Sequence, residues 1–249
     1  MALKWDYTEL ASKYDDRADY DSLLIAEVFN FHAHTSIPTI LDMGAGTGKL
    51  TKELVKLKCD VIASEPNDEM RKFGEINAKS SNCRWINSPG ENIGVENKTI
   101  DSVWFGSSFN VVNHNLLGPE LRRILKPRSW LTCLWNHRDL SDPFQQEVEN
   151  IIKHEIKNYD YGTRRKDPST DIENLGFFGQ VTKFESNFKI NIPSKSYVEA
   201  WKSHATLQRQ CNSQEHFLEL ISKIEKLLEN QENLEVPYTT RLWTSQAID

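Results

Sequence analysis

The sequence predicts an α/β fold in which a doubly wound, mostly parallel sheet of seven strands carries helical insertions near the C-terminal half. Two observations lead to this prediction. Short β-forming runs alternate with segments of helical periodicity through the first half of the chain, which is typical of βα units. Two further β-forming runs follow, at Phe184–Ile192 and Tyr238–Thr244, with a long amphipathic segment between them. The 249 residues contain no repeat and no linker, so we expect one domain over residues 1–249.

Five strands are predicted in the first half from runs rich in β-branched and aromatic residues. They cover Thr39–Met43, Asp60–Ser64, Arg84–Asn87, Ile100–Phe105 and Trp130–Trp135. Apolar residues recur at helical spacing in the connections, so each connecting helix has one face to pack on the sheet. These positions are Leu50, Leu54 and Leu57, then Met70, Phe73 and Ile76, and then Leu117, Leu121, Ile124 and Leu125.

Helices are also predicted outside this alternating part. Residues 1–38 are expected to form an N-terminal helical cap, in which Leu24 and Val28 share the apolar face of one helix. Segments 141–175 and 193–233 are expected to be helical insertions, because both contain amphipathic stretches between predicted strands.

Composition and charge argue for a folded protein without a polyanionic partner. The chain is 38% hydrophobic and 27% charged, and its net charge of -6 gives no basic surface for nucleic acid. Arg164-Arg165-Lys166 is the one compact basic cluster, and we expect it to be a solvated turn. No apolar run approaches the roughly 20 residues of a membrane-spanning helix, so no membrane segment is expected.

Cysteine usage and the first residues of the chain favour a cytoplasmic protein. The four cysteines are widely spaced and form no C-x-x-C pair, so neither a zinc site nor a redox motif is predicted. Residues 1–21 are acidic and aromatic instead of basic and then apolar, which is not the pattern of a signal peptide. We therefore expect reduced thiols, no bound metal and a cytoplasmic location.

The strongest local signal is a glycine-rich turn directly after the first predicted strand, in the sequence LDMGAGTG at residues 41–48. Glycine is needed where a turn bends sharply and a ligand approaches the backbone, and free N–H groups in such a turn bind polar ligand atoms. The turn therefore predicts a site for a nucleotide-like cofactor. Asp42, two positions ahead of Gly44, is expected to orient the turn through hydrogen bonds to the backbone.

A second acidic residue, Glu65, lies where the second predicted strand ends. A carboxylate in that place can accept hydrogen bonds from both hydroxyls of a ribose. Two cofactor classes remain open at this point, because nicotinamide dinucleotide enzymes also place an acid about 20 residues after their glycine turn. Their turn is G-x-G-x-x-G, however, whereas this chain has G-x-G-x-G after Asp42, so the spacing favours another nucleotide-like cofactor.

Five segments together resemble the successive motifs of class I S-adenosylmethionine-dependent methyltransferases, in particular a small-molecule branch similar to the type 11 methyltransferases. They are DMGAGTG at 42–48, SPGENI at 88–93, TIDSV at 99–103, ELRRILKP at 120–127 and LWNHRD at 134–139. The resemblance implies a Rossmann-like fold, with S-adenosyl-L-methionine as cofactor and segments 141–175 and 193–233 on the substrate side.

The resemblance also implies which residues bind the cofactor. They are Asp42, Gly44, Ala45, Gly46, Glu65, Pro66, Gly90, Glu91 and Ser107. Pro89 stands where relatives often have an Asp or Thr that helps to recognise adenine, so recognition of the base is expected to rely on Gly90 and Glu91. Met70, five positions beyond Glu65, is assigned to packing of the hydrophobic core.

The general base is sought among the histidines. Relatives in this branch often have a histidine after the fourth strand, but Asn110 occupies that position here. We assign the role of base to His204, because imidazole titrates near neutral pH and because relatives build the substrate wall from this part of the chain. His114 and His137 are further candidates.

The predicted function is transfer of a methyl group to O or N of a small-molecule acceptor, without nucleic-acid or membrane partners. Tyr14 and Arg17 are candidates for a lid over the cofactor, with a solvated helix face as the alternative. Two other functions stay open: a nicotinamide-dependent oxidoreductase, and a non-catalytic regulatory protein that binds S-adenosylmethionine.

Overall fold

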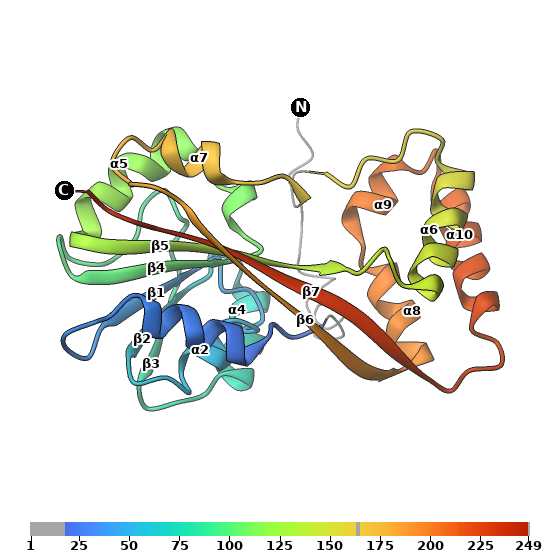
Figure 1. The fold of residues 1–249 in the computed structure, drawn as a ribbon, viewed down its shortest axis with the longest axis horizontal. Coiled ribbons are helices and arrows are strands. Elements are labelled where there is room, and N and C mark those ends of the chain that lie inside the picture. Colours follow the sequence, from blue (N-terminus) through green and yellow to red (C-terminus); the bar gives the residue numbers. More distant parts are fainter. Residues whose placement is uncertain (1–17, 163–164, 249) are drawn as a thin grey trace.

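The computed structural model describes residues 18–162 and 165–248, and a seven-stranded sheet forms its centre (Figure 1). The sheet order is β3-β2-β1-β4-β5-β7-β6, in which the pairs among the first five strands are parallel and β7 is antiparallel to both β5 and β6. The predicted fold class is confirmed. The strands are β1 (Thr39–Met43), β2 (Asp60–Ser64), β3 (Cys83–Ile86), β4 (Ile100–Gly106), β5 (Leu125–Arg138), β6 (Thr182–Pro193) and β7 (Asn233–Gln246).

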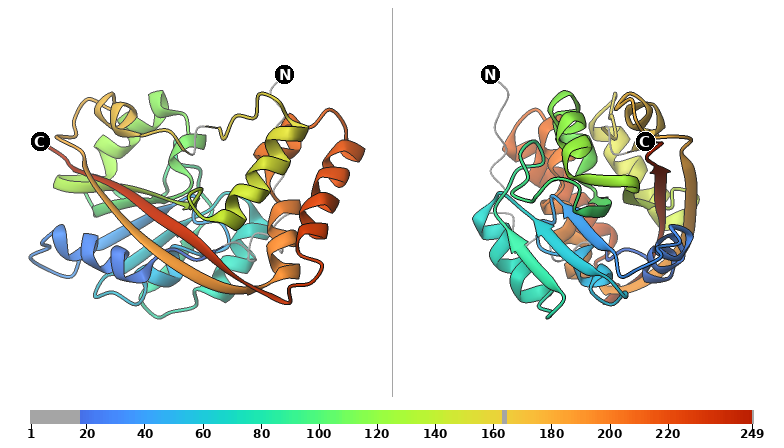
Figure 2. Two further views of the ribbon diagram at one scale, coloured as in Figure 1. Left: turned by 45° about the vertical axis from the view of Figure 1, so that its right-hand side comes forward. Right: turned by 90° about the vertical axis from the view of Figure 1, so that its left-hand side faces the viewer.

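The helices in these two ranges lie on both faces of the sheet and at one end of it (Figure 2). They are α2 (Ser22–Phe31), α3 (Thr51–Leu54), α4 (Asp68–Asn77), the short 3-10 helix η2 (Phe109–Val111), α5 (His114–Ile124), α6 (Pro143–Glu155), α7 (Ser169–Glu173), α8 (Ser194–Lys202), α9 (Ala205–Gln210) and α10 (Gln214–Leu227). None of them is long and apolar enough to cross a lipid bilayer.

Strands β1 and β2 have the predicted bounds, whereas β5, β6 and β7 are longer than predicted. The pairing of β7 with β5 continues from Trp130 opposite Gln246 to Arg138 opposite Tyr238. The additional part of β5 carries polar residues, which residue propensity does not mark as strand. Residues 136–138 are extended because their backbone is paired with β7, an interaction between residues about 100 positions apart in sequence.

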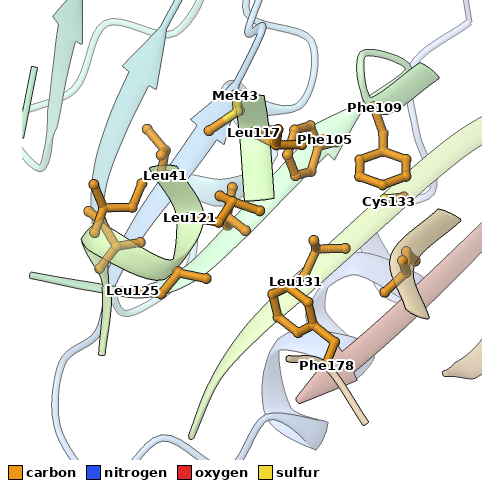
Figure 3. Packing of buried hydrophobic residues seen from close by; sticks show 14 of the residues in the cluster. Leu41, Met43, Phe105, Phe109, Leu117, Leu121, Leu125, Leu131, Cys133 and Phe178 are labelled. Atoms are coloured by element: carbon orange, nitrogen blue, oxygen red, sulfur yellow. The ribbon is translucent and has the colours of Figure 1, made fainter. Parts of the chain in front are cut away.

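Alternate residues of the central strands pack on opposite faces of the sheet, as the two-residue period of a strand requires. On one face, α2 and α3 cover a buried cluster that includes Ile40 and Trp104. On the other face, α5 and α7 cover a cluster that includes Leu41, Phe105 and Leu131 (Figure 3). Burial on both faces explains why the central strands are almost wholly apolar.

Two of the predicted helical faces differ from the structure. Helix α3 has only four residues, so Leu57 lies beyond its end, although it still packs against the buried cluster. The prediction that Ile76 packs on the sheet is wrong, since its side chain is 75% exposed. The buried residues of α4 are Met70 and Gly74, because the indole of Trp85 lies against Gly74 and the helix meets β3 on that side.

A third hydrophobic cluster lies beyond the carboxyl end of β5, in a helical lobe that we define as α6, α8, α9 and α10 (Figure 1). Its buried residues include Val148, Trp201 and Leu220 from the helices and Val236 from β7. Segment 141–175 is divided between the lobe and the sheet. Helix α6 belongs to the lobe, whereas Ile172 of α7 packs in the cluster that α5 and α7 cover on one face of the sheet. The long ribbon of β6 and β7 joins the lobe to the sheet.

Two helical glycines give a matched test of packing. A Cβ atom at Gly74 would lie 2.1 Å from Trp85 Cη2, whereas at Gly118 of α5 the nearest atom is Leu175 Cδ2 at 3.6 Å. We expect Gly74→Ala to lower the free energy of unfolding by about 1–3 kcal/mol through overpacking. Gly118→Ala should instead raise it by up to about 1 kcal/mol through helix propensity. Urea titrations of both variants check this, and equal effects of the two would contradict it.

Candidate functional site

The glycine turn after β1 has a backbone that other residues do not readily adopt. Gly44, Gly46 and Gly48 have φ angles of 70°, 59° and 84°, in the left-handed region. A Cβ atom on Gly44 would lie only 2.7 Å from Ser108 Cβ, and one on Gly48 would lie 3.2 Å from the Cα of Gly74. Both backbone conformation and close approach therefore require glycine in this turn.

Hydrogen bonds from the turn to the end of β2 hold it in place. The amides of Gly44 and Ala45 donate to the carbonyl oxygen of Ser64, at 2.9 and 3.0 Å. The amide of Gly46 donates to Glu65 Oε2 at 2.9 Å, while Glu65 Oε1 accepts from the amide of Asn67 at 2.8 Å. Glu65 thus connects the turn to the start of α4, and each of its oxygens still has a second lone pair for a ligand.

Burial dominates the electrostatics of the two carboxylates. It raises the pKa of Asp42, which is completely buried, to about 7, against the opposing effect of a hydrogen bond from Thr51. Burial also raises the pKa of Glu65, although hydrogen bonds from Asn67 and Gly46 act in the opposite direction. A cation bound beside either group would favour its ionised form.

Asp42 bonds to a different partner from the one expected. Its Oδ2 accepts from the hydroxyl of Thr51 at 2.6 Å, at the start of α3, instead of from the amides of Gly44 to Gly46. Its Oδ1 is buried and has no hydrogen-bond partner among the described residues. A buried acceptor without a hydrogen-bond partner lowers the stability of the folded protein unless a ligand donates to it.

The segment after β3 is fixed by close packing. A Cβ atom on Gly90 would lie 3.0 Å from Met43 Sδ and 3.1 Å from Val112 Cγ1. Glu91 Oε1 accepts from the amide of Asn113 at 2.9 Å, just before α5. In this arrangement the Glu91 side chain joins its loop to α5.

Two residues of the ELRRILKP segment extend the same connection. Glu120 Oε1 accepts from the amide of Ile93 at 2.6 Å. Arg123 donates to the carbonyl oxygens of Ile93 and Val95, both at 2.8 Å, and forms an ion pair with Glu120 at 2.7 Å. The resemblance gave these residues no role, and the structure shows that they hold the loop after β3 against α5.

One cavity of about 1310 Å³ lies at the carboxyl ends of β1, β2, β4 and β5. The chain leaves β1 toward β2 and β3 on one side and returns to β4 on the other, and such a switch point is where open α/β sheets bind ligands. All of the predicted site residues line this cavity, namely Asp42, Gly44, Ala45, Gly46, Glu65, Pro66, Gly90, Glu91, Ser107 and His204.

Several lining residues were not predicted. Met70, assigned to the core, is buried and also lines the cavity, with its methyl group 3.5 Å from a Cβ built on Gly46. Asn136 and Arg138 lie in the LWNHRD segment, which was noted but given no site residue. Tyr20, Tyr197 and Trp201 also line it, and no local motif marks them.

A short stretch of chain before α2 crosses the cavity wall. Asn136 Nδ2 donates to the carbonyl oxygens of Ala18 and Asp19, at 3.2 and 2.8 Å. The hydroxyls of Tyr20 and Ser107 hydrogen-bond at 2.9 Å, and Ser107 has a φ angle of 59° at the end of β4. The predicted lid residues, Tyr14 and Arg17, lie outside the described residues.

The three candidate histidines differ in whether they line the cavity and in the contacts that they make. His204 lines the cavity, but its Nδ1 accepts from the amide of Leu207 at 3.2 Å as the N-cap of α9. A neutral ring in that tautomer carries its proton on Nε2 and is a donor there. His114 hydrogen-bonds to the carbonyl oxygen of Phe109 at 2.9 Å, and neither it nor the buried His137 is among the cavity residues. Asn110 Oδ1 accepts from Trp135 Nε1 at 3.4 Å.

Comparison with known sequences gives a consistent result. Residues 41–133 match the methyltransferase domain family. An uncharacterized methyltransferase of Mycobacterium tuberculosis is 33% identical over 113 residues, which are 45% of this chain and 46% of that protein. Another from Schizosaccharomyces pombe is 26% identical over 147 residues, 59% of this chain and 58% of that protein. The chain thus spans about half the length of the curated relatives that it matches.

Solved structures share the fold over nearly the whole chain. A protein from Anaeromyxobacter dehalogenans, described as a candidate type II methyltransferase, has a TM-score of 0.65 at 14% identity and covers 93% of this chain and 97% of its own. A phosphoethanolamine N-methyltransferase of Haemonchus contortus, in complex with S-adenosylhomocysteine, has a TM-score of 0.53 at 13% identity and covers 96% of this chain and 57% of its own. The sequence matches and the seven-stranded fold together support a class I methyltransferase.

Proposed function

We propose that this protein binds S-adenosyl-L-methionine in the cavity and transfers its methyl group to O or N of a small-molecule acceptor. The observation that carries the proposal is the convergence of the glycine turn, Asp42, Glu65 and the Gly90 loop on one cavity at the carboxyl ends of the strands. A cytoplasmic location belongs to the same proposal, and it agrees with the four free cysteines.

The residues present fit the parts of this cofactor. The unpartnered Oδ1 of Asp42 is a suitable acceptor for an ammonium group. Glu65 retains lone pairs for ribose hydroxyls, and Gly46 leaves space for a ligand close to the backbone. Gly90 and the methyl group of Met70 supply surfaces on which a planar base can lie.

The cofactor, when bound, supplies an electrophilic methyl group on a sulfonium. The task of the protein is then to orient the acceptor and to exclude water. Tyr20 and Asn136, which hold the 18–21 segment against the cavity wall, exclude water from the cofactor end. His204, with Nδ1 used as a helix cap, is suited to donate a hydrogen bond to the acceptor instead of removing its proton.

The oxidoreductase alternative finds little support. A dinucleotide pyrophosphate rests on the N-terminus of a helix that follows its glycine turn directly. Here α3 begins seven residues after Gly44 and contains only four residues. The regulatory alternative is decided by turnover, because a non-catalytic binder would not methylate any acceptor in a broad screen.

Calorimetric titration tests the cofactor without knowledge of the acceptor. We expect saturable binding of S-adenosylhomocysteine and no binding of NADH or NADPH, because the site is built for a single nucleoside beside an amino acid. Binding of a nicotinamide nucleotide alone would support an oxidoreductase and overturn the proposal. Failure of all three to bind would also contradict it.

The role of Glu65 can be tested with an isosteric variant. Glu65→Gln should weaken binding of S-adenosylhomocysteine by about 1.5–3 kcal/mol, because a charged acceptor of ribose hydroxyls is lost. Glu75→Gln is the matched control, because Glu75 is half exposed on α4 and its ion pair with Arg71 is long, at 3.9 Å. Circular dichroism verifies that both variants fold. An unchanged Kd for Glu65→Gln would contradict the assignment.

The raised pKa of Asp42, about 7, predicts proton release on binding. The ammonium group of S-adenosylhomocysteine stabilises the ionised carboxylate, so at about pH 6 binding should release close to one proton, and affinity should fall as pH falls below about 7. Calorimetry in two buffers of different ionisation enthalpy measures this release, and Asp42→Asn should abolish it. Equal binding enthalpies in both buffers would show that Asp42 is not linked to the cofactor.

A further inference from the structure

Carboxylates and guanidinium groups line different ends of the cavity. The carboxylates that line it, Asp42, Glu65 and Glu91, all belong to the cofactor end. We define the acceptor end by five lining residues in and between β5, α8 and α9, namely Arg138, Tyr197, Trp201, His204 and Arg209. Among the described lining residues, this acceptor end contains two guanidinium groups and no carboxylate.

Arg138 is held rigidly with its guanidinium at the cavity wall. Its Nη2 donates to Glu149 Oε2 at 3.0 Å and its Nη1 to Gln145 Oε1 at 3.3 Å. The guanidinium also lies over the ring of Trp201, with 4.6 Å between its Cζ and the ring centroid. The side chain is only 12% exposed, so a ligand would meet a preorganised donor and not a mobile one.

The charge of Glu149 does not cancel the positive charge around Arg138. Glu149 lies behind the wall and is shared, because Lys153 Nζ is 3.3 Å from its Oε1 and the hydroxyl of Tyr161 donates to the same oxygen. Arg165 adds a further guanidinium, which donates to the carbonyl oxygen of Arg138 at 3.3 Å. Arg138 and Lys153 therefore share one carboxylate, and Arg165 lies next to Arg138.

The position of Arg165 corrects a sequence expectation. A solvated turn was expected at Arg164-Arg165-Lys166, but the Arg165 guanidinium packs on the ring of Tyr161 at 4.6 Å, and burial lowers its pKa. Arg164 lies outside the described residues. Arg165 is thus partly buried beside Arg138, and positive charge is concentrated behind the acceptor end.

From this arrangement we propose that the acceptor is an organic anion, a carboxylate or a phosphate monoester, whose charged group binds to Arg138 with Arg209 at the outer edge. The aromatic side chains of Tyr197 and Trp201 then pack against its apolar body. This inference rests on the proposed methyltransferase function and narrows its acceptor class.

The same residues argue against a cationic acceptor. An aromatic wall can bind an ammonium group by cation–π contact, but the face of Trp201 is already covered by Arg138. A second cation there would meet the positive charge of Arg138 and Arg209. An ionised oxygen, in addition, has no proton to lose, which agrees with a His204 ring that is a donor at Nε2.

Competition among matched small molecules tests the proposal. With S-adenosylhomocysteine at saturation, calorimetry would measure binding of phenylacetate, glutarate and phenyl phosphate. Phenylacetamide and glutaramide are the neutral matches, and phenethylamine is the cationic one. We expect at least one anion to bind at least about tenfold more tightly than its neutral match, with affinity that falls as salt rises, and no binding of the amine. The carboxylate and phosphate arms then identify which anion is preferred.

Variants locate the binding group. Arg209→Gln should weaken the preferred anion by roughly threefold to tenfold and leave the Kd of S-adenosylhomocysteine unchanged. The double variant Arg138→Gln with Glu149→Gln should remove the preference for anions, and it removes both members of the buried ion pair together. Lys223→Gln is the matched control, because it removes one positive charge of the helical lobe that does not line the cavity and that pairs with Glu155 instead of Glu149.

The outcomes separate the two proposals. If S-adenosylhomocysteine does not bind, the cofactor assignment fails. If S-adenosylhomocysteine binds but no anion of the panel is preferred to its neutral match, or if the double variant retains the preference, the anionic acceptor is overturned and the cofactor site stands.

Discussion

The close approach of Gly44 to Ser108 is the constraint on which the cofactor end of the cavity depends. The end of β4 crosses so near the turn after β1 that no side chain fits between them. The turn must therefore take its hydrogen-bond partners from β2, through the carbonyl oxygen of Ser64 and the carboxylate of Glu65. Three strands are thereby fixed relative to one backbone segment, which gives the site a geometry set before any ligand arrives.

The acceptor end depends on a different kind of interaction. Here Arg138 is positioned by an ion pair and by the ring of Trp201, and both partners come from the helical lobe. The turn around Gly44 is made of backbone contacts that few substitutions preserve, whereas the acceptor end is made of side chains. The first arrangement suits a constant ligand and the second suits a ligand that differs from one protein to another.

The sequence was informative where the structure depends on neighbours in the chain. The positions of β1 and β2, the need for glycine at 44 and 46, and the place of Glu65 all follow from short segments whose conformation is locally determined. Arg138 and Tyr20 could not be assigned in the same way, because the contacts of Arg138 with Trp201 and of Tyr20 with Ser107 join residues far apart in sequence. For His204, the sequence predicted the position but not the tautomer. Its segment was expected to form part of the cavity wall, whereas the tautomer depends on the hydrogen bond that Nδ1 accepts from the amide of Leu207.

The β6–β7 ribbon has a consequence for how this protein can diversify. Both helical segments of the lobe begin and end on β5, β6 and β7, whose ladder of backbone hydrogen bonds does not depend on side-chain identity. The helical lobe can then be replaced as a module, while the strands that hold the glycine turn stay in register. Under the proposed function, exchange of that module between relatives would change acceptor preference without rebuilding the sheet.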